Sequence, residues 1–141
     1  MLELISDKNW EELEKHNLDT EHDIVKIRQL VRFNAKELRM GIVDQTRITT
    51  AVSEILRNMY NYAGGGVVLI EKSEINGKQA LIVTCTDSGP GISDLELAMS
   101  DGYTSDMGMG YGLPGAKRLV DRFEIQTDVK EGTIIRLMKW S

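Results

Sequence analysis

The sequence predicts an α+β fold, a two-layer sandwich in which helices cover one face of a mostly antiparallel mixed sheet. Two observations lead to this prediction. Two long segments carry apolar residues at helical spacing, and two pairs of Val- and Ile-rich segments are each joined by a short glycine-containing turn. Helices packed on one face of such a sheet bury a single core between two layers.

Length and composition limit the alternatives. A chain of 141 residues with 41% hydrophobic residues fits one domain with its own core. The net charge of −5 argues against a nucleic-acid surface and leaves a protein or small molecule as the partner. Cys85 is the only cysteine and is expected to be buried and unreactive. No apolar run is long enough for a membrane span or a signal peptide, so we expect a cytoplasmic protein with no membrane partner.

The first half of the chain predicts a short strand and two helices. Residues 1–15 form either an amphipathic helix or a tail that docks on a partner, and residues 16–20 an edge strand. Asp23 is expected to cap a helix that Gly41 ends. The second helix is expected to begin near Asp44 and to stop at the three glycines 64–66.

The second half predicts two hairpins with a loop and a helix between them. Residues 67–71 and 80–86 are expected to pair as antiparallel strands around the Asn76-Gly77 turn. One helical turn is expected at 94–99, and a longer helix at 113–123. A closing hairpin pairs residues 124–129 with residues 133–140.

Three motifs carry the chemistry. Glu54 and Asn58 lie one turn apart on the second helix and share a face. The sequence Asp-Ser-Gly-Pro-Gly at 87–91 follows a strand, and alternating glycines at 108–115 lead into the helix at 113–123. Alternating glycines let backbone N–H groups approach a phosphate, and a helix N-terminus adds a positive dipole end. Alone, such a loop is more often a flexible connection than a nucleotide site.

The order of these motifs, closed by Gly132-Thr133, resembles the ATP-binding (Bergerat) fold shared by gyrase, Hsp90, histidine kinases and MutL, the GHKL superfamily. The short lid, the sequence Gly-Leu-Pro-Gly-Ala-Lys-Arg-Leu at 112–119 and the stretch 44–51 are most similar to the switch-protein serine/threonine kinases of stressosomes. The resemblance covers residues 19–141. It implies one ATP-binding kinase domain at 16–141, preceded by an extension at 1–15 of unknown role.

The resemblance also implies an activity and partners. Proteins of that group use Mg·ATP to phosphorylate Ser or Thr on STAS-domain proteins. Phosphorylation then frees the kinase from this partner to engage a downstream effector such as a phosphatase or another signalling enzyme. A second hypothesis is a nucleotide-gated binding module, of the anti-sigma or adaptor kind, in which catalysis is slow or incidental.

The ATP site that the resemblance implies has an adenine end and a phosphate end. The Asp87 carboxylate accepts a hydrogen bond from the exocyclic amine of adenine, a donor that guanine lacks at that position. The remaining ATP-binding residues implied are Asn58, Gly89, Gly91, Gly108, Met109, Gly110, Tyr111, Gly112, Leu113, Lys117 and Thr133. The simpler alternatives are an acidic turn residue for Asp87 and a strand-start threonine for Thr133.

Two side chains on the second helix are implied to act on the phosphates. Glu54 is the candidate general base, and Asn58 is the candidate ligand of Mg²⁺. In proteins this ion keeps several waters and binds phosphate oxygens in addition to its protein ligand. The alternatives are a solvated Glu54 paired with Arg57 or Asn58, and an Asn58 that merely lies on the helix surface.

Positive charge near the γ-phosphate is not evident in the sequence. No Lys or Arg occurs between residues 79 and 116, while the expected lid at 92–107 carries four acidic residues. We expect Mg²⁺ and the loop amides to neutralise most of the phosphate charge, with help from Lys117, Arg118 or a partner. The simpler interpretation of Lys117 is an ion pair with Asp121, one turn later.

Overall fold

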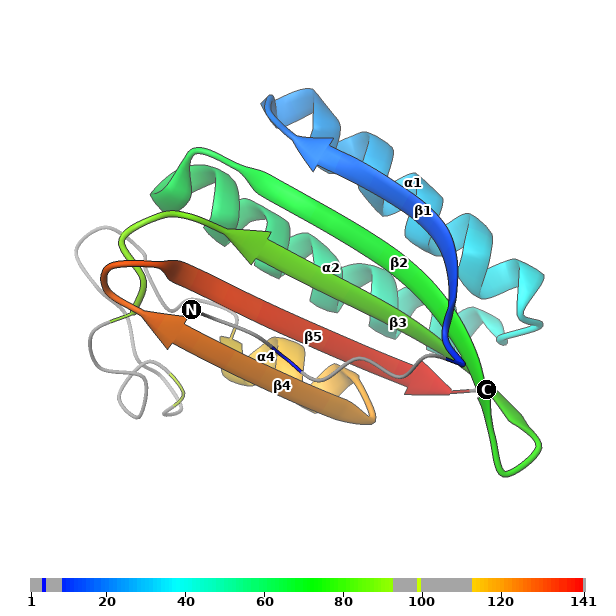
Figure 1. The fold of residues 1–141 in the computed structure, drawn as a ribbon. Coiled ribbons are helices and arrows are strands. Elements are labelled where there is room, and N and C mark those ends of the chain that lie inside the picture. Colours follow the sequence, from blue (N-terminus) through cyan, green and yellow to red (C-terminus); the bar gives the residue numbers. More distant parts are fainter. Residues whose placement is uncertain (1–3, 5–8, 93–98, 100–112, 141) are drawn as a thin grey trace.

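The computed structural model describes residues 4, 9–92, 99 and 113–140 (Figure 1). The elements in chain order are β1 (Glu11–Leu18), α1 (Glu21–Glu37), α2 (Ile42–Ala63), β2 (Gly66–Ile75), β3 (Lys78–Asp87), α4 (Leu113–Leu119), β4 (Arg122–Asp128) and β5 (Gly132–Trp140). None of the helices in this part of the chain is long and apolar enough to cross a bilayer.

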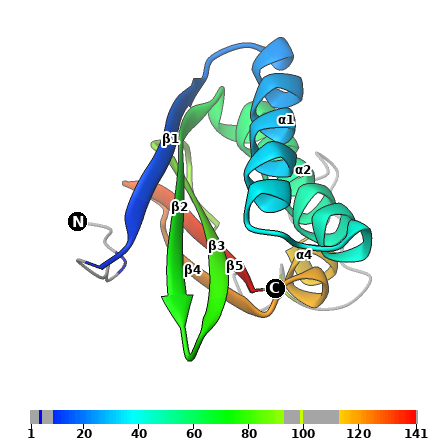
Figure 2. The same ribbon diagram turned by 90° about the vertical axis from the view of Figure 1, so that its right-hand side faces the viewer.

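The strands form one sheet with the order β1-β2-β3-β5-β4, and the helices lie on one side of it (Figure 2). The α+β two-layer sandwich is therefore confirmed. Each of the four neighbouring strand pairs in this sheet is antiparallel, so the parallel component that a mixed sheet requires is absent from the described strands. Because β5 inserts between β3 and β4, the end of β3 lies beside the start of β5.

Both ends of α1 and the start of α2 differ from the prediction. Thr20 is the N-cap of α1, and Asp23 is the third helical residue, whose carboxylate accepts the Thr20 backbone N–H at 2.9 Å in a capping box. The helix ends at Glu37, because Arg39 adopts a left-handed conformation with φ of 63°. Gly41 is the N-cap of α2 instead of the stop of α1. The C-terminal cap of α2 at Gly64 is as predicted, with φ of 75°.

The edge strand is longer than predicted. It begins at Glu11, so residues 11–15 belong to the sheet and form neither a helix nor a free tail, and it stops at Leu18 instead of residue 20. The Asn76-Gly77 hairpin is confirmed, with positive φ at both turn residues and β2 and β3 longer than predicted at each end. The helix expected at 113–123 ends at Leu119, and β4 begins at Arg122.

The core lies between the helices and the near face of the sheet. Its residues come from every layer and are at most 9% exposed; among them are Ile27 and Val31 of α1, Val52 and Ile55 of α2, and Val83 and Leu137 of the sheet. Cys85 belongs to this core, as predicted, and burial raises the pKa of its thiol to about 12. A thiol with that pKa is not a nucleophile at neutral pH.

The face of the sheet away from the helices carries a polar cluster. Arg136 is 3% exposed, donates from Nε to the Thr84 hydroxyl at 3.0 Å, and lies 4.9 Å from the centre of the Trp10 ring. This cation–π contact ties the residue before β1 to the middle of β5. Trp10 is half-buried, so its role is packing on the sheet rather than free exposure.

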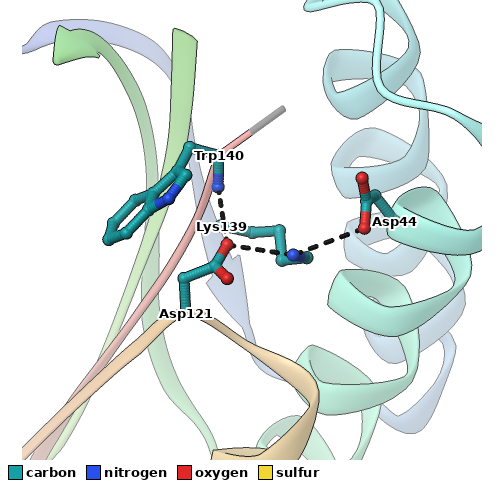
Figure 3. A network of polar contacts seen from close by, with 4 residues as sticks. All are labelled: Asp44, Asp121, Lys139 and Trp140. Atoms are coloured by element: carbon teal, nitrogen blue, oxygen red, sulfur yellow. Dashed lines mark hydrogen bonds and ion pairs between the residues drawn. The ribbon is translucent and has the colours of Figure 1, made fainter. Parts of the chain in front are cut away.

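An ion-pair network joins the first turn of α2 to the sheet (Figure 3). The Lys139 ammonium on β5 lies 2.9 Å from the Asp121 carboxylate and 3.3 Å from that of Asp44. Asp121 also accepts the Trp140 backbone N–H at 3.0 Å. The Lys139 side chain is only 9% exposed, so both carboxylates are needed to compensate its charge.

Replacing Lys139 with Met is expected to lower the free energy of unfolding by about 1–2 kcal/mol. The substitution leaves two carboxylates near each other without a cation, and their partial exposure limits the cost. Urea denaturation at neutral pH measures the change. Lys130→Met, at the exposed turn before β5, is the matched control, and an equal loss in both variants would contradict a specific role for the network.

Candidate functional site

The end of the sheet where β3 stops and β5 begins lies on the left in Figure 1. A cleft opens at this end. The last two turns of α2 and the start of α4 form its other walls, and the space within it that is open to water-sized molecules is about 50 Å³. The lining residues are Ile55, Asn58, Met59, Tyr62, Ala63, Asp87, Pro90, Gly91, Ile92, Leu113, Thr133 and Ile135.

Asp87 is the one carboxylate among the described residues that line this cleft. It ends β3 directly opposite Thr133, and its Oδ1 accepts the Gly89 backbone N–H at 2.9 Å. Burial raises the pKa of its carboxyl above the usual range, and hydrogen bonds from the backbone of Gly89 and Thr133 partly oppose that shift. A half-buried carboxylate inside a mostly apolar cleft is suited to accept a hydrogen bond from a ligand's amine.

Thr133 forms the floor beside Asp87. It is 6% exposed, and its hydroxyl lies 2.8 Å from that of Thr127 on β4. The Thr127 hydroxyl also accepts the Ile92 backbone N–H at 2.9 Å, which fixes the loop after Gly91 against the closing hairpin. Thr127 was not among the predicted site residues, because nothing in the sequence distinguishes it from any other strand threonine.

The glycines after Asp87 fit closely against the protein itself. A Cβ on Gly89 would lie 2.4 Å from the Ala63 Cβ, and one on Gly91 would lie 2.3 Å from the Asp128 carbonyl oxygen. Gly91 also has φ of 70°, which favours glycine. The loop therefore requires glycine at both positions to pass between α2 and the β4–β5 turn, whether or not a ligand is bound.

Asn58 lies on the wall that α2 contributes to the cleft, where it is half-buried. No three His, Cys, Asp or Glu residues in the described ranges are grouped as a metal cage. The amide oxygen of Asn58 is a hard, neutral donor of the kind that Mg²⁺ accepts when phosphates and waters provide its other ligands. The residues present therefore fit an ion that enters with a nucleotide.

Glu54 lies one turn before Asn58 but borders a different hollow. It lines a groove between α1 and α2 that we call the arginine groove, after Arg28, Arg32 and Arg57. Its Oε1 lies 2.8 Å from the Arg57 guanidinium, the pairing that the sequence left open as the simpler alternative. The two side chains that the sequence predicted to share a helix face thus lie at two adjacent hollows, the cleft and the groove.

The glycine loop is largely outside the described residues. Gly108, Met109, Gly110, Tyr111 and Gly112, the lid and the turn expected at 94–99 fall there, apart from Ile92 and Met99. Leu113, which follows the loop, is 2% exposed and lines the cleft at the start of α4. Lys117 is exposed on α4, and its expected partner Asp121 instead binds Lys139.

The apolar walls of the cleft were missed at the sequence level. Met59, Tyr62 and Ile135 line it, yet in the sequence they are ordinary members of a helical or strand pattern. The helical spacing does indicate that these side chains share a face of α2, since the residues at positions 55, 58, 59 and 62 recur at intervals of three and four. The cleft thus combines an apolar slot of aromatic and aliphatic side chains with one carboxylate at its end.

Comparisons with known proteins identify relatives of this chain. Residues 43–140 match the family described as histidine kinase-, DNA gyrase B-, and HSP90-like ATPases. The serine/threonine-protein kinase RsbT of Bacillus subtilis is 51% identical over 86% of this chain and 91% of its own length. An anti-sigma F factor of Pasteuria penetrans is 32% identical over 73% of each chain, and one of Thermoanaerobacter sp. is 28% identical over 80% of this chain and 82% of its own.

Solved structures share the fold at low sequence identity. A chain of the SiaB-SiaC complex of Pseudomonas aeruginosa superposes with a TM-score of 0.56 at 13% identity, over 92% of this chain and 91% of that one. The catalytic domain of the histidine kinase ThkA gives 0.51 at 17% identity, over 90% and 95% of the two chains. At these identities the likeness concerns the arrangement of helices and strands.

Proposed function

The chain belongs to the histidine kinase-, DNA gyrase B-, and HSP90-like ATPases and, within them, to the RsbT-type serine/threonine protein kinases, and we propose that it transfers the γ-phosphate of Mg·ATP to Ser or Thr of a STAS-domain protein. The observation that carries this proposal is the convergence of Asn58, Asp87, Leu113 and Thr133 on one cleft. These residues come from four separate elements, and the fold brings them to one end of the sheet.

The adenine end of the proposed site is the apolar slot. Asp87 accepts the exocyclic amine of adenine, while its Oδ1 stays oriented by the Gly89 N–H. Guanine carries a carbonyl oxygen at that position, and two acceptors facing each other in a half-buried cleft repel, so ATP is selected over GTP. Thr133, held by Thr127, lies beside Asp87 and completes this end.

The phosphate end lies toward Asn58 and Glu54. The amide oxygen of Asn58 would hold Mg²⁺, which would supply positive charge to neutralise the phosphate oxygens. One turn before Asn58 on α2, Glu54 accepts the proton from the attacking Ser or Thr hydroxyl as the new P–O bond forms and the bond to the departing ADP oxygen breaks. The glycine loop at 108–112 and Lys117 are proposed to contact the phosphates.

We propose that the partners follow the switch-protein scheme in the cytoplasm. The substrate is a STAS-domain scaffold or antagonist of the stressosome type, and its phosphorylation frees this chain to bind a downstream effector such as a phosphatase. The identity to RsbT over nearly all of that protein's length supports this scheme. The proposal assigns no role to nucleic acid or membrane.

The second candidate is a nucleotide-gated binding module. The likeness to anti-sigma F factors supports it, and so does the Glu54–Arg57 ion pair, which occupies the carboxylate that catalysis needs. In such a module, ATP would govern whether the chain holds its partner, and transfer would be incidental. The two candidates differ in what happens when Glu54 is changed.

The test is incubation with γ-labelled ATP, Mg²⁺ and candidate STAS-domain proteins, followed by mapping of the labelled residue. The proposal expects label on one Ser or Thr of the partner, none when EDTA removes the metal, and little competition from GTP. Nucleotide-dependent partner binding without any label transfer would favour the binding module instead.

A further inference from the structure

The arginine groove runs along the outer surface of the helical layer, between α1 and α2. It is lined by Arg28, Gln29 and Arg32 of α1 and by Thr49, Thr50, Ser53, Glu54 and Arg57 of α2, and the space within it that is open to water-sized molecules is about 380 Å³. These residues recur at intervals of three and four along each helix, so both helices present one polar face to the same hollow. The groove is separate from the nucleotide cleft, and no residue lines both.

The charge of the groove is opposite to that of the whole chain. Three arginines and one glutamate line it, whereas the chain carries a net charge of −5. Neither Arg28 nor Arg32 forms an ion pair within the part of the chain that the structure describes. Guanidinium groups that form no ion pair of their own are suited to bind anionic side chains, because they are planar donors that recognise carboxylates through pairs of hydrogen bonds.

A buried hydroxyl at the base of the groove points to a missing partner. Thr49 is 5% exposed, and its Oγ1 is a buried side-chain oxygen without a hydrogen bond in the described structure. The neighbouring Ser53 hydroxyl is satisfied, since it donates to the Thr49 carbonyl at 2.8 Å. Buried hydroxyls are nearly always paired, so a ligand that shifts the groove enough to reach the Thr49 hydroxyl would complete its hydrogen bonding.

We propose that the arginine groove binds an acidic segment of the protein substrate, which flanks the Ser or Thr that receives the phosphate. This inference rests on the proposed kinase function, because Glu54 joins the groove to the site of transfer. An acceptor hydroxyl at Glu54 puts the neighbouring residues of the same segment over Arg28, Arg32 and Thr49. The segment is therefore recognised by carboxylates that pair with the free arginines.

The same binding event alters the Glu54–Arg57 pair. This pair is partly exposed, with 35% of the Glu54 side chain and 50% of the Arg57 side chain accessible, and exposed pairs of this kind are weak. A substrate carboxylate competes with Glu54 for the Arg57 guanidinium. Once Arg57 turns to the substrate, the Glu54 carboxylate is released to accept the proton of the acceptor hydroxyl. Docking thus prepares the base.

The test uses the full chain and two fluorescent peptides that differ only in charge. Each has a central Ser, flanked by Glu in one peptide and by Gln in the other, and binding is followed by anisotropy without nucleotide. The Glu peptide is expected to bind at least tenfold more tightly than the Gln peptide, and raising the ionic strength is expected to weaken its binding. Equal binding of the two peptides would overturn the proposal.

Variants locate the binding surface. The double variant Arg28→Gln, Arg32→Gln is expected to bind the Glu peptide at least tenfold more weakly. The control double variant Lys26→Gln, Lys36→Gln removes the same charge from α1 outside the groove, and its affinity for the Glu peptide is expected to change less than threefold. Circular dichroism checks that both double variants stay folded. Equal losses in the two variants would overturn the assignment.

Two further outcomes identify other occupants and would also overturn the proposal. Complete displacement of the Glu peptide by inorganic phosphate alone at millimolar concentration would make the groove a site for a free anion. Self-association that is lost in the Arg28 and Arg32 double variant would assign the groove to a second copy of this chain. If the Glu peptide binds but no acceptor protein is ever phosphorylated, the groove is a peptide-binding surface and the proposed kinase function is wrong. The two proposals can therefore fail separately.

Discussion

Replacing Glu54 with Gln is expected to lower the rate of phosphate transfer by about 10²–10⁴-fold, because the amide cannot accept the proton of the attacking hydroxyl. ATP affinity is expected to change by less than about threefold, since Glu54 lies outside the cleft that receives the nucleotide. The measurements are single-turnover transfer with saturating substrate and equilibrium binding of labelled ATP.

Glu74→Gln, on an exposed position of β2 far from the cleft, is the matched control and should keep the full rate. The same variants decide between the two candidate functions. A kinase that uses transfer to switch partners loses that switch when Glu54 is changed. A binding module still binds its partner in a nucleotide-dependent way when Glu54 is changed. If the Glu54 variant kept both partner exchange and phosphate transfer, Glu54 would have no part in the mechanism.

Asp87→Asn is expected to weaken ATP binding by about ten- to a hundredfold. A hydrogen bond to a charged acceptor contributes about 1.5–3 kcal/mol, and the variant replaces that acceptor with a neutral amide that presents a donor as well. Discrimination against GTP should fall with it. Competition between ATP and GTP for the cleft measures both effects, and an unchanged ratio would contradict the assignment of Asp87 to the adenine amine.

The same substitution is expected to make the nucleotide-free protein more stable at about pH 7. Burial raises the pKa of Asp87 in the folded state, so the folded protein binds its proton more tightly than the unfolded chain does. Stability is therefore lost as pH rises through the folded pKa, and it is regained at lower pH. Asn still offers an oxygen to the Gly89 N–H without carrying the charge.

The gain in the free energy of unfolding should shrink as pH falls from about 7 toward about 4, because protonation of Asp87 in the folded state removes the charge that burial penalises. Urea unfolding of both proteins at the two pH values, without nucleotide, measures it. If the free energy of unfolding of the variant were lower than that of the parent by the same amount at both pH values, the charge of Asp87 would not be the cause of the difference.

The parts of the fold that the sequence predicted correctly depend on local signals. The Asn76-Gly77 turn places both residues at positive φ, which few other pairs adopt, and it therefore fixes the β2–β3 register directly. Gly64 ends α2 for the same reason. Both helices were expected because their buried residues recur at helical spacing over several turns.

The parts that were wrong depend on tertiary contacts. Strand β1 is polar along most of its length, and it is a strand because β2 offers an unpaired edge, which no local pattern reveals. The stop of α1 was placed at Gly41 because glycine is the usual left-handed residue, whereas the chain uses Arg39 there. The capping box at Thr20 was missed because Asp23 is itself a common cap residue.

The candidate site was predictable where the chain places functional residues at strand ends and turns. Asp87, Gly91 and Thr133 meet at one cleft with Asn58 as expected, because β3 and β5 are neighbours. The arginine groove was not predictable. Arg28, Arg32 and Arg57 are dispersed in the sequence and resemble ordinary solvated helix residues, and only the packing of α1 on α2 brings them together.

The central claim is that the cleft between α2, β3 and β5 binds the adenine of Mg·ATP with Asp87 at its end. The most direct measurement is a titration of ¹⁵N-labelled protein with Mg·ATP, followed by the backbone amide signals. The account predicts saturable shifts that are largest from Asp87 to Ile92 and at Thr133, smaller shifts along the arginine groove, and little change with GTP. Shifts confined to other surfaces, or equal responses to ATP and GTP at the cleft, would contradict it.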